Sequence, residues 1–435
     1  MKKTAMMLGV VLWVVVAAGV ARADNSFAVD LYRQYTLREG NIFFSPYSLS
    51  SALEMAYEGA RGNTASEMRS VLGLLSDEGE RRERVSEEIS RFNRSVEDMT
   101  EEDWIAEQQE MLEVRGQSSS DARRRAEMWM ADPGIAENLR SERYELRVAN
   151  ALWAQEAYPF LPEYLDIVTR VYSAEARNLD FIDDPEGSRI TINDWVAERT
   201  KDRIQDLLPL GSIDSLTRLV LTNAVYFKGK WAHAFEEDRT SEEVFWLDAD
   251  RSVPVQMMFR SGGYEYFEND LLQVLRLPYK GPGLSMIVLL PKDRALGRLE
   301  KDISASDLKE WTAALHFEET VEVSLPRFRF EQGHEMKESL VALGMREAFD
   351  DNFADFSGMT GEREIYIDQV YHKAFIDVNE EGTEAAAATA VVMDTLGMPM
   401  MNNKVFLADH PFLFLIEDQK TGTILFMGRV MDPTK

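Results

Sequence analysis

The sequence predicts a single domain of the α+β class, and three observations support this prediction. The β-rich runs lie at 147–153, 219–227, 284–290, 321–330, 365–378 and 412–426. They are long and mostly not separated by regular crossover helices, which favours α+β over a doubly wound sheet. Helical spacing of apolar residues occurs at 162–171, 190–207, 304–314 and 335–343. Neither an internal repeat nor a Pro/Gly-rich linker divides residues 24–435, so we expect one domain there.

The first 23 residues have the pattern of an export signal. A short basic start at residues 1–3 precedes an apolar run over 6–20 and a small-x-small sequence at 21–23. This order is typical of a signal peptide cut after Ala23. An uncleaved anchor is the alternative, but the apolar run is short for a bilayer span. We therefore expect a secreted protein, extracellular or periplasmic, with no membrane contact after cleavage.

Residues 26–145 are predicted to be mainly helical. From 26 to 75 the helical pattern is broken at 41–47, where a short strand or turn is expected. Residues 76–145 are rich in Glu, Arg, Ser and Gln, which indicates helices with solvated faces and a flexible spot at 116–120. The basic run at 123–125 fits one solvated helix face better than a polyanion site.

The charge balance excludes several classes of partner. The chain carries 48 Lys and Arg against 76 Asp and Glu, a net charge of −28. Such acidity repels nucleic acid and anionic membrane surfaces, so we expect neither as a partner. Cysteine is absent, which excludes thiol catalysis and iron–sulfur clusters. A chain of 435 residues is long enough for a core that needs no disulfides.

The sequence contains no recognisable catalytic pattern. The histidines are His233, His316, His334, His372 and His410, and no two of them have the close spacing of metal ligands. A Gly-x-Ser-x-Gly elbow, a phosphate-binding loop and a dinucleotide fingerprint are also missing. His372 lies in a β-rich run, which favours a hydrogen-bonded core histidine over a catalytic one. We expect no enzyme, no metal and no cofactor.

One segment, residues 380–396, has an unusual composition. Its middle is alanine-rich and uncharged, which fits a helix capped by Thr383. Read at period two, one face carries Thr383, Ala385, Ala387, Thr389, Val391 and Met393, without a charge. The two charged residues that flank this uncharged middle, Glu384 and Asp394, fall on the other face. The segment therefore also fits a strand with one buried face, and the pattern leaves helix and strand open.

Several motifs, in order along the chain, resemble those of the serpin family. They are NIFFSPYSLSSAL at 41–53, GARGNT at 59–64, DLLP at 206–209, TNAVYFKGKW at 222–231, VYHKA at 370–374, the segment 379–389, HPF at 410–412 and GRV at 428–430. Any one of these would be a weak signal. Together and in this order they are specific, and the resemblance extends over nearly all of residues 24–435. We identify the chain as similar to inhibitory serpins.

The resemblance implies a fold and a mechanism. The fold has three β-sheets, about nine helices and an exposed reactive loop at about 380–404. A target serine protease attacks this loop and forms a covalent acyl-enzyme. The cut loop then enters the main sheet as a new strand, and serpin loop insertion is itself a standard example of strand addition. The implied partner is a serine protease, and the inhibitor is expected to be a monomer.

The resemblance also assigns residues to these roles. Family spacing places the scissile bond at Leu396–Gly397, which points to chymotrypsin-like targets. The implied hinge is Glu380, Glu381, Gly382, Thr383, Glu384, Ala385, Ala386, Ala387, Ala388 and Thr389. The implied shutter and breach residues, which control opening of the sheet, are Ser45, Ser48, Asn223, His372, Trp231 and Arg327. Arg327 is expected to pair with Glu380, and none of these residues is catalytic.

Two alternatives remain open within the family. One is a non-inhibitory serpin that acts as a carrier, chaperone or storage protein, which the alanine-rich hinge opposes. The other is a cross-class inhibitor of cysteine proteases. The stretch at about 90–145 is longer than the usual family segment and is predicted to be an insertion, either a solvated decoration or a partner-binding arm. A basic helix for glycosaminoglycan binding is not evident.

Overall fold

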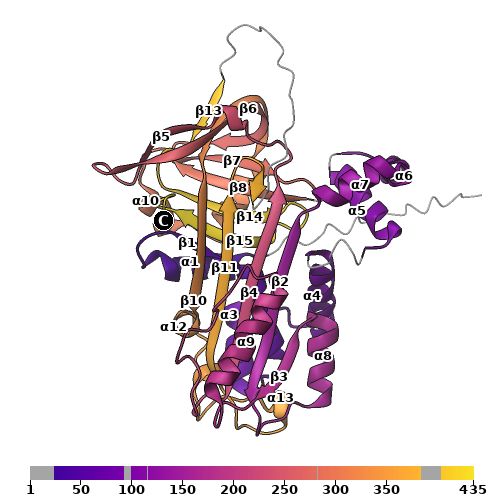
Figure 1. Ribbon diagram of the computed structural model, residues 1–435, viewed down its shortest axis with the longest axis vertical. Coiled ribbons are helices and arrows are strands. Elements are labelled where there is room, and N and C mark those ends of the chain that lie inside the picture. The colour runs from indigo at the N-terminus through magenta and orange to yellow at the C-terminus, as the bar shows by residue number, and fades with distance from the viewer. Residues whose placement is uncertain (1–23, 93–98, 115, 282, 384–402) are drawn as a thin grey trace, which may run out of the picture.

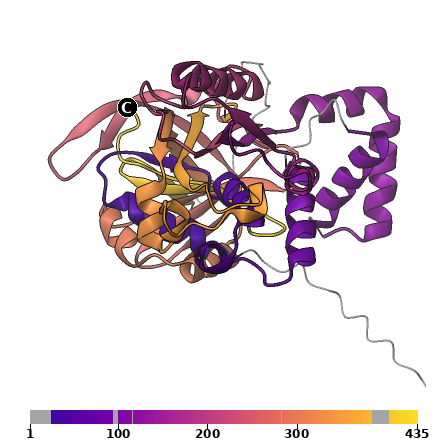
Figure 2. The same ribbon diagram turned by 90° about the horizontal axis from the view of Figure 1, so that it is seen from below.

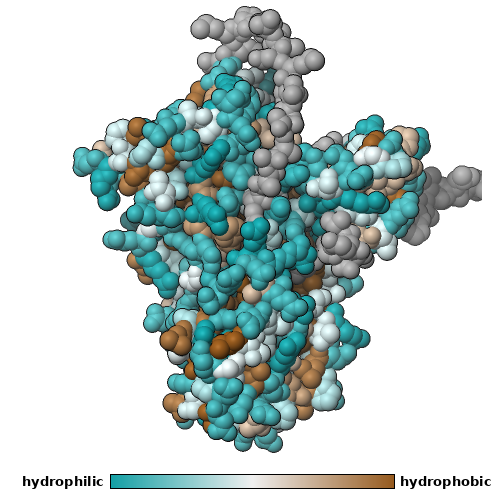
Figure 3. All heavy atoms as spheres, in the orientation of Figure 1, coloured by the Kyte–Doolittle hydropathy of each residue, from teal (hydrophilic) through white to brown (hydrophobic). Residues whose placement is uncertain are grey.

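The computed structural model describes residues 24–92, 99–114, 116–281, 283–383 and 403–435, and these form thirteen α-helices and fifteen β-strands. Hydrogen bonds join the strands into a six-stranded and a nine-stranded sheet. Figure 1 shows the six-stranded sheet running along the molecule, with much of the nine-stranded sheet at its upper end. The face in Figure 3 is mostly hydrophilic with scattered apolar groups. Within the described ranges, no helix is both long and apolar enough to span a bilayer.

The six-stranded sheet has the order β10-β11-β12-β4-β2-β3. Its strands are β10 (Phe328–Glu335), β11 (Ile367–Val378), β12 (Gly382–Thr383), β4 (Leu219–Lys230), β2 (Glu145–Gln155) and β3 (Glu175–Leu179). The two-residue β12 separates β11 from β4 at one end of the sheet, whereas further along β11 and β4 pair directly and in parallel.

The nine-stranded sheet has the order β1-β15-β14-β8-β7-β6-β9-β13, with β5 on a branch from β6. Its strands are β1 (Ile42–Phe44), β5 (Ser241–Trp246), β6 (Ser252–Glu268), β7 (Leu272–Pro278), β8 (Leu284–Pro291), β9 (His316–Pro326), β13 (Lys404–Leu407), β14 (Phe412–Asp418) and β15 (Ile424–Val430). The first part of β6 pairs with β5 and its last part with β7. Counting these two parts separately gives the three sheets that the resemblance implies.

The helices cover both faces of the six-stranded sheet. They are α1 (Ser26–Thr36), α2 (Pro46–Gly59), α3 (Gly62–Leu72), α4 (Glu78–Phe92), α5 (Glu101–Val114), α6 (Ser119–Ala131), α7 (Pro133–Glu142), α8 (Pro162–Tyr172), α9 (Pro185–Arg199), α10 (Leu296–Asp302), α11 (Ala305–Ala313), α12 (Lys337–Leu343) and α13 (Ser357–Thr360). On one face α9 packs Trp195 edge-on against Trp153 of β2, with ring centroids 5.4 Å apart. On the other face α1 and α2 contribute to the largest core cluster.

The stretch predicted as an insertion forms α5, α6 and α7. These helices pack around a small core of Trp104, Ala126, Met130 and Ala136. They lie beyond the upper end of β2 in Figure 1 and to one side of the rest of the protein in Figure 2. Helices of this length need such packing because isolated helices are marginal in water. The small core explains why a polar stretch folds at all.

Ion pairs join these three helices to the rest of the protein, with the acids on the inserted helices. The pairs are Glu107–Arg143 at 2.9 Å, Glu110–Arg91 at 3.0 Å, Glu110–Lys420 at 3.0 Å and Glu142–Lys280. Several of the side chains are partly exposed, so salt screens their attraction. The attachment of the inserted helices should therefore weaken at high ionic strength.

Three predicted elements needed correction. The run at 321–330 is two strands, because at Arg327 the chain passes from the nine-stranded to the six-stranded sheet. The run at 412–426 is a hairpin, whose turn includes Gly422 at φ +72°. The helix predicted to reach 207 ends at Arg199, since Lys201 and Asp202 adopt left-handed backbone angles. The thirteen helices also exceed the nine implied, in part because the insertion adds three.

Candidate functional site

β12 lies between β11 and β4 at one end of the six-stranded sheet. Thr383 pairs with Val378 of β11 on one side and with Gly229 of β4 on the other. Further along, β11 and β4 pair directly with each other, from Phe375 opposite Tyr226 to Ile367 opposite Leu219. β4 and β11 are therefore separated by an intervening strand only at this end of the sheet. The remaining length between β4 and β11 is closed and has the orientation to receive an antiparallel strand.

Thr383 is enclosed at this entry point. Its side chain has no exposed surface, and its Oγ1 lies 2.8 Å from Oη of Tyr279. Tyr279 stacks on Trp231, with ring centroids 4.6 Å apart. At Gly382 an added Cβ would lie 2.1 Å from the carbonyl oxygen of Gly229. Because that oxygen belongs to β4, it cannot move aside, and only glycine fits before Thr383.

The residues just before β12 are bonded to Arg327, between β9 and β10, and to the segment that follows β4. Arg327 donates hydrogen bonds to Glu380, whose Oε1 lies 2.6 Å from Nη2 and 2.8 Å from Nε. Burial would raise the pKa of Glu380, but the hydrogen bonds from Arg327 and Thr240 outweigh it and hold the pKa below its usual value. Trp231 Nε1 donates to the carbonyl oxygen of Asn379 at 2.9 Å. These bonds anchor the start of the loop whether or not it enters the sheet.

A second polar cluster lies midway along the sheet, where β4 and β11 still pair. His372 of β11 is directly opposite Asn223 of β4, and its Nδ1 lies 2.5 Å from Asn223 Oδ1. Ser48 Oγ donates to the same oxygen at 3.0 Å, and Asn223 Nδ2 donates to Asn150 of β2. All of these side chains are buried. A strand entering between β4 and β11 must break the bond between His372 and Asn223.

The protonation state of His372 follows from its partners. The backbone N–H of Ser45 donates to His372 Nε2 at 3.0 Å, so this nitrogen carries no proton and Nδ1–H is the donor to Asn223. Burial lowers the pKa of His372 well below its usual value, and the neighbouring His334 lowers it further. His334 stacks against His372 with ring centroids 6.1 Å apart, and burial lowers its pKa to about 4. Both rings are neutral at neutral pH.

We expect acid to destabilise the protein through these two rings. Because each folded-state pKa is lowered, the unfolded chain binds protons first, and stability present above about pH 6.5 is lost as the pH falls toward the folded pKa. For His334 this loss is roughly 2 kcal/mol at about pH 5. The midpoint of urea unfolding, measured from about pH 7 to about pH 5, should fall less in His334→Gln than in the unchanged protein.

His316→Gln is the matched control, because this histidine is exposed on β9. Its unfolding midpoint should follow that of the unchanged protein at every pH. Parallel pH profiles for all three proteins would show that carboxylates, and not the buried histidine, cause the acid sensitivity.

The structure brings the predicted site residues into these two clusters. Glu380, Glu381, Gly382, Thr383, Trp231 and Arg327 lie at the entry point, and Ser45, Ser48, Asn223 and His372 form the midway cluster. The hinge residues 384–389 and the bond Leu396–Gly397 lie outside the described residues. Sequence reasoning missed Tyr279, Thr240, Asn150 and His334. Asn150 has the signal of a polar residue in a β-rich run, which does not identify its partner, and the sequence around the other three gives no such signal.

The described part of the chain contains no group of three or more His, Cys, Asp or Glu side chains placed to hold a metal ion. The two clusters join strands and loops through hydrogen bonds and one ion pair. Neither presents a nucleophile beside a base in a cavity, the arrangement that catalysis needs.

Comparisons with known proteins identify the fold. The model of a family described as "Serpin (serine protease inhibitor)" matches residues 22–433. A serpin-like protein of Thermococcus kodakarensis is 41% identical over 416 residues, covering 95% of this chain and 86% of that protein. Serpin48 of the insect Tenebrio molitor superposes with a TM-score of 0.75 at 30% identity, covering 94% of this chain and 96% of that one. Human thyroxine-binding globulin, solved with thyroxine, gives 0.72 at 26% identity over 94% and 97% of the chains.

The chain belongs to the serpin family. The match extends over nearly the whole chain, so the family and the α+β serpin fold expected from the motifs are confirmed.

Proposed function

We propose that this protein is a secreted inhibitor of chymotrypsin-like serine proteases. It holds its target as a covalent acyl-enzyme after its own cut loop enters the six-stranded sheet. The observation that carries this proposal is the unfilled strand position between β4 and β11. Of the described residues, Gly382 and Thr383 of β12 stand in that position, and β4 pairs directly with β11 beyond them.

The segment after β12 has the length that this position requires. Leu396 lies 13 residues after Thr383, which is about 43 Å in an extended strand. β4 and β11 have 12 residues each, or about 40 Å. A strand extended from Thr383 would therefore carry Leu396 to the opposite end of the sheet, together with any protease attached to it.

The chemistry of the trap starts at the carbonyl carbon of Leu396. The protease hydroxyl oxygen attacks this carbon, the bond to the nitrogen of Gly397 breaks, and Gly397 leaves with a new amino group. Leu396 is then joined to the protease through an ester. Insertion of the freed strand must outpace hydrolysis of that ester. The face that would be buried carries only small or neutral side chains, so insertion desolvates no charge there.

Leu396 suits the apolar primary pocket of a chymotrypsin-like protease. No Lys or Arg lies between Glu381 and Lys404, so trypsin-like targets are not expected. Secretion rests on the signal pattern of residues 1–23, which lie outside the described residues.

Incubation with chymotrypsin, elastase, trypsin and papain tests the proposal. Chymotrypsin should form a complex that survives denaturing electrophoresis and release a fragment beginning at Gly397, identified by mass spectrometry. Leu396→Arg should move complex formation from chymotrypsin to trypsin. A loop that all four proteases cut, with no complex, would contradict inhibition. A stable complex with papain alone would indicate a cross-class inhibitor of cysteine proteases.

A second candidate function is binding of a small molecule without inhibition. The fold similarity to thyroxine-binding globulin favours it. Such a carrier would also be cut in its loop, but it would behave as a substrate in the incubation above.

A further inference from the structure

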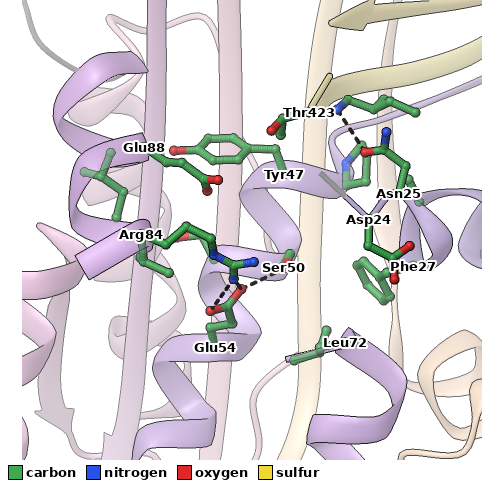
Figure 4. Close-up of a pocket in the computed structure, with 17 residues that line it drawn as sticks. Asp24, Asn25, Phe27, Tyr47, Ser50, Glu54, Leu72, Arg84, Glu88 and Thr423 are labelled. Carbon is green, nitrogen blue, oxygen red and sulfur yellow. Dashed lines mark hydrogen bonds and ion pairs between the residues drawn. The ribbon is translucent and has the colours of Figure 1, made fainter. Parts of the chain in front are cut away.

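A cavity lies between α1, α2 and α4, on the opposite side of α2 from the sheet. Its volume is about 100 Å³, smaller than a cavity of about 150 Å³ that holds a benzene molecule. Phe27, Leu72 and Val85 form part of its apolar wall, and Tyr47, Glu54 and Glu88 are among its polar lining residues. Figure 4 shows the labelled apolar residues Phe27 and Leu72 on the side away from Glu88. The cavity thus has a carboxyl-rich end at Glu54 and Glu88 and a second end where Phe27 and Leu72 lie near the carboxyl of Asp24.

Two polar groups at the carboxyl-rich end have no partner. The hydroxyl of Tyr47 is buried and makes no hydrogen bond, and the residue is only 7% exposed. In Figure 4 this hydroxyl points toward the side chain of Glu88. Glu88 makes no hydrogen bond or ion pair with any described residue, and its only basic neighbours interact with it at longer range. A buried polar group without a partner, such as the Tyr47 hydroxyl, usually marks a position for a ligand or an ordered water. Glu88 beside it is half-buried.

The charges around the cavity favour a cation. Arg84 is the basic residue of its lining, and its Nη2 lies 3.2 Å and 3.3 Å from the two carboxylate oxygens of Glu54. Arg84 therefore compensates Glu54, and its Nε makes no hydrogen bond to a described residue. The carboxyl of Glu88 makes no ion pair with a described residue, and Arg84 and Arg91 act on it only at longer range. Burial raises its pKa to about 7, with Glu54 adding to the effect.

We propose that this cavity binds an alkylammonium group, with the nitrogen between Glu88 and Oη of Tyr47 and the methylenes against Phe27 and Leu72. An ammonium has three N–H donors, which suits a carboxylate and a phenol oxygen lacking donors. The small volume admits a short linear chain and not a large ring. Two sources share this chemistry: a free alkylamine and the lysine side chain of another protein.

Binding here would act on the sheet through α2. Tyr47 lies on the first turn of α2, between Ser45 and Ser48, which belong to the midway cluster with His372 and Asn223. A ligand that holds Tyr47 would hold this turn and keep β4 and β11 together. This regulatory consequence rests on the proposed function, because it expects slower loop insertion, whereas the binding itself does not depend on it.

Calorimetric titration of the protein with n-butylammonium chloride tests the proposal. We expect saturable binding near neutral pH, with release of part of a proton as Glu88 becomes fully ionised, measured by comparing buffers of different ionisation enthalpy. n-Butanol has the same chain without the charge and should not bind. Nα-acetyl-lysinamide separates the two sources, since binding by it would indicate a lysine side chain as the natural ligand. If neither n-butylammonium nor Nα-acetyl-lysinamide binds, the proposed site is overturned.

Glu88→Gln and Tyr47→Phe should each weaken n-butylammonium binding, the first by at least about tenfold, as loss of a charge-assisted contact predicts. Glu87→Gln is the matched control, because it removes the same charge from the next, exposed residue of α4. Equal weakening in Glu87→Gln and Glu88→Gln would show nonspecific attraction to an acidic protein and overturn the proposal. Binding without any change in the rate of complex formation with chymotrypsin would overturn only the regulatory consequence.

Discussion

Replacing Thr383 with arginine is expected to convert the protein from an inhibitor into a substrate. Thr383 is fully buried between β4 and β11, with its hydroxyl against Tyr279. A guanidinium group at this position would lose its hydration without gaining a carboxylate, at a cost of several kcal/mol. Because this position is already enclosed in the intact protein, the arginine should displace β12 from the sheet. Insertion would have to bury the cation again, and it would stall while the ester hydrolyses. The ratio of covalent complex to cut protein on a denaturing gel should fall at least about tenfold, which corresponds to only about 1.4 kcal/mol.

Two variants control for this result. Thr383→Ser keeps the hydroxyl near Tyr279 and should still form complexes. Glu384→Arg introduces the same cation one residue later, on the face that the period-two pattern assigns to solvent, and should also inhibit. Continued cleavage of Thr383→Arg at Leu396–Gly397, with an unchanged circular dichroism spectrum, would show that the variant is folded. Complexes that persist in folded Thr383→Arg would refute the inserted-strand mechanism.

Cutting the loop without a protease partner attached is expected to raise the melting temperature by more than about 10 °C. The new strand would pair with β4 and β11 along their whole length, and each cross-strand pair adds roughly 0.2–1 kcal/mol. A gain of about 10 kcal/mol in a chain of about 400 residues corresponds to roughly 12 °C at the specific entropy of globular proteins. Calorimetry of intact and nicked protein, after the nicking protease has been removed, measures this shift.

Thr383→Arg links the two predictions. Its nicked form should melt close to its intact form, because the strand cannot enter past the buried cation. If the nicked form of the unchanged protein also melts no higher than the intact one, the position between β4 and β11 is not a receiving site and the proposed function fails. The carrier alternative would then gain support.

The sequence alone was enough to predict the family, whereas the hinge assignment stays a prediction. The ordered motifs identify the serpin fold because each contains residues of a packing or hydrogen-bonding position. Ser45, Ser48, Asn223 and His372, which are far apart in the chain, do meet in one buried cluster.

Strands with exposed faces were harder to predict. β5 has four exposed residues, three of them in the sequence Ser-Glu-Glu, and β6 has no continuous apolar run. Their stability comes from pairing between strands, β5 with β6 and β6 also with β7 and β9, which local periodicity does not record. The break at Arg327 was missed for the same reason, because β9 and β10 are each β-rich but belong to different sheets.

Local sequence determined which residues could serve in a strand that enters the sheet: a glycine, then a threonine, then small side chains on one face. Only the tertiary structure decided that Gly382 and Thr383 already stand between β4 and β11 and that the position beyond them is unfilled. It also decided that Tyr47 and Glu88, 41 residues apart in the sequence, face one cavity. The physical reason is that strand partners and cavity walls are set by contacts between distant segments, and these depend on how the whole core packs.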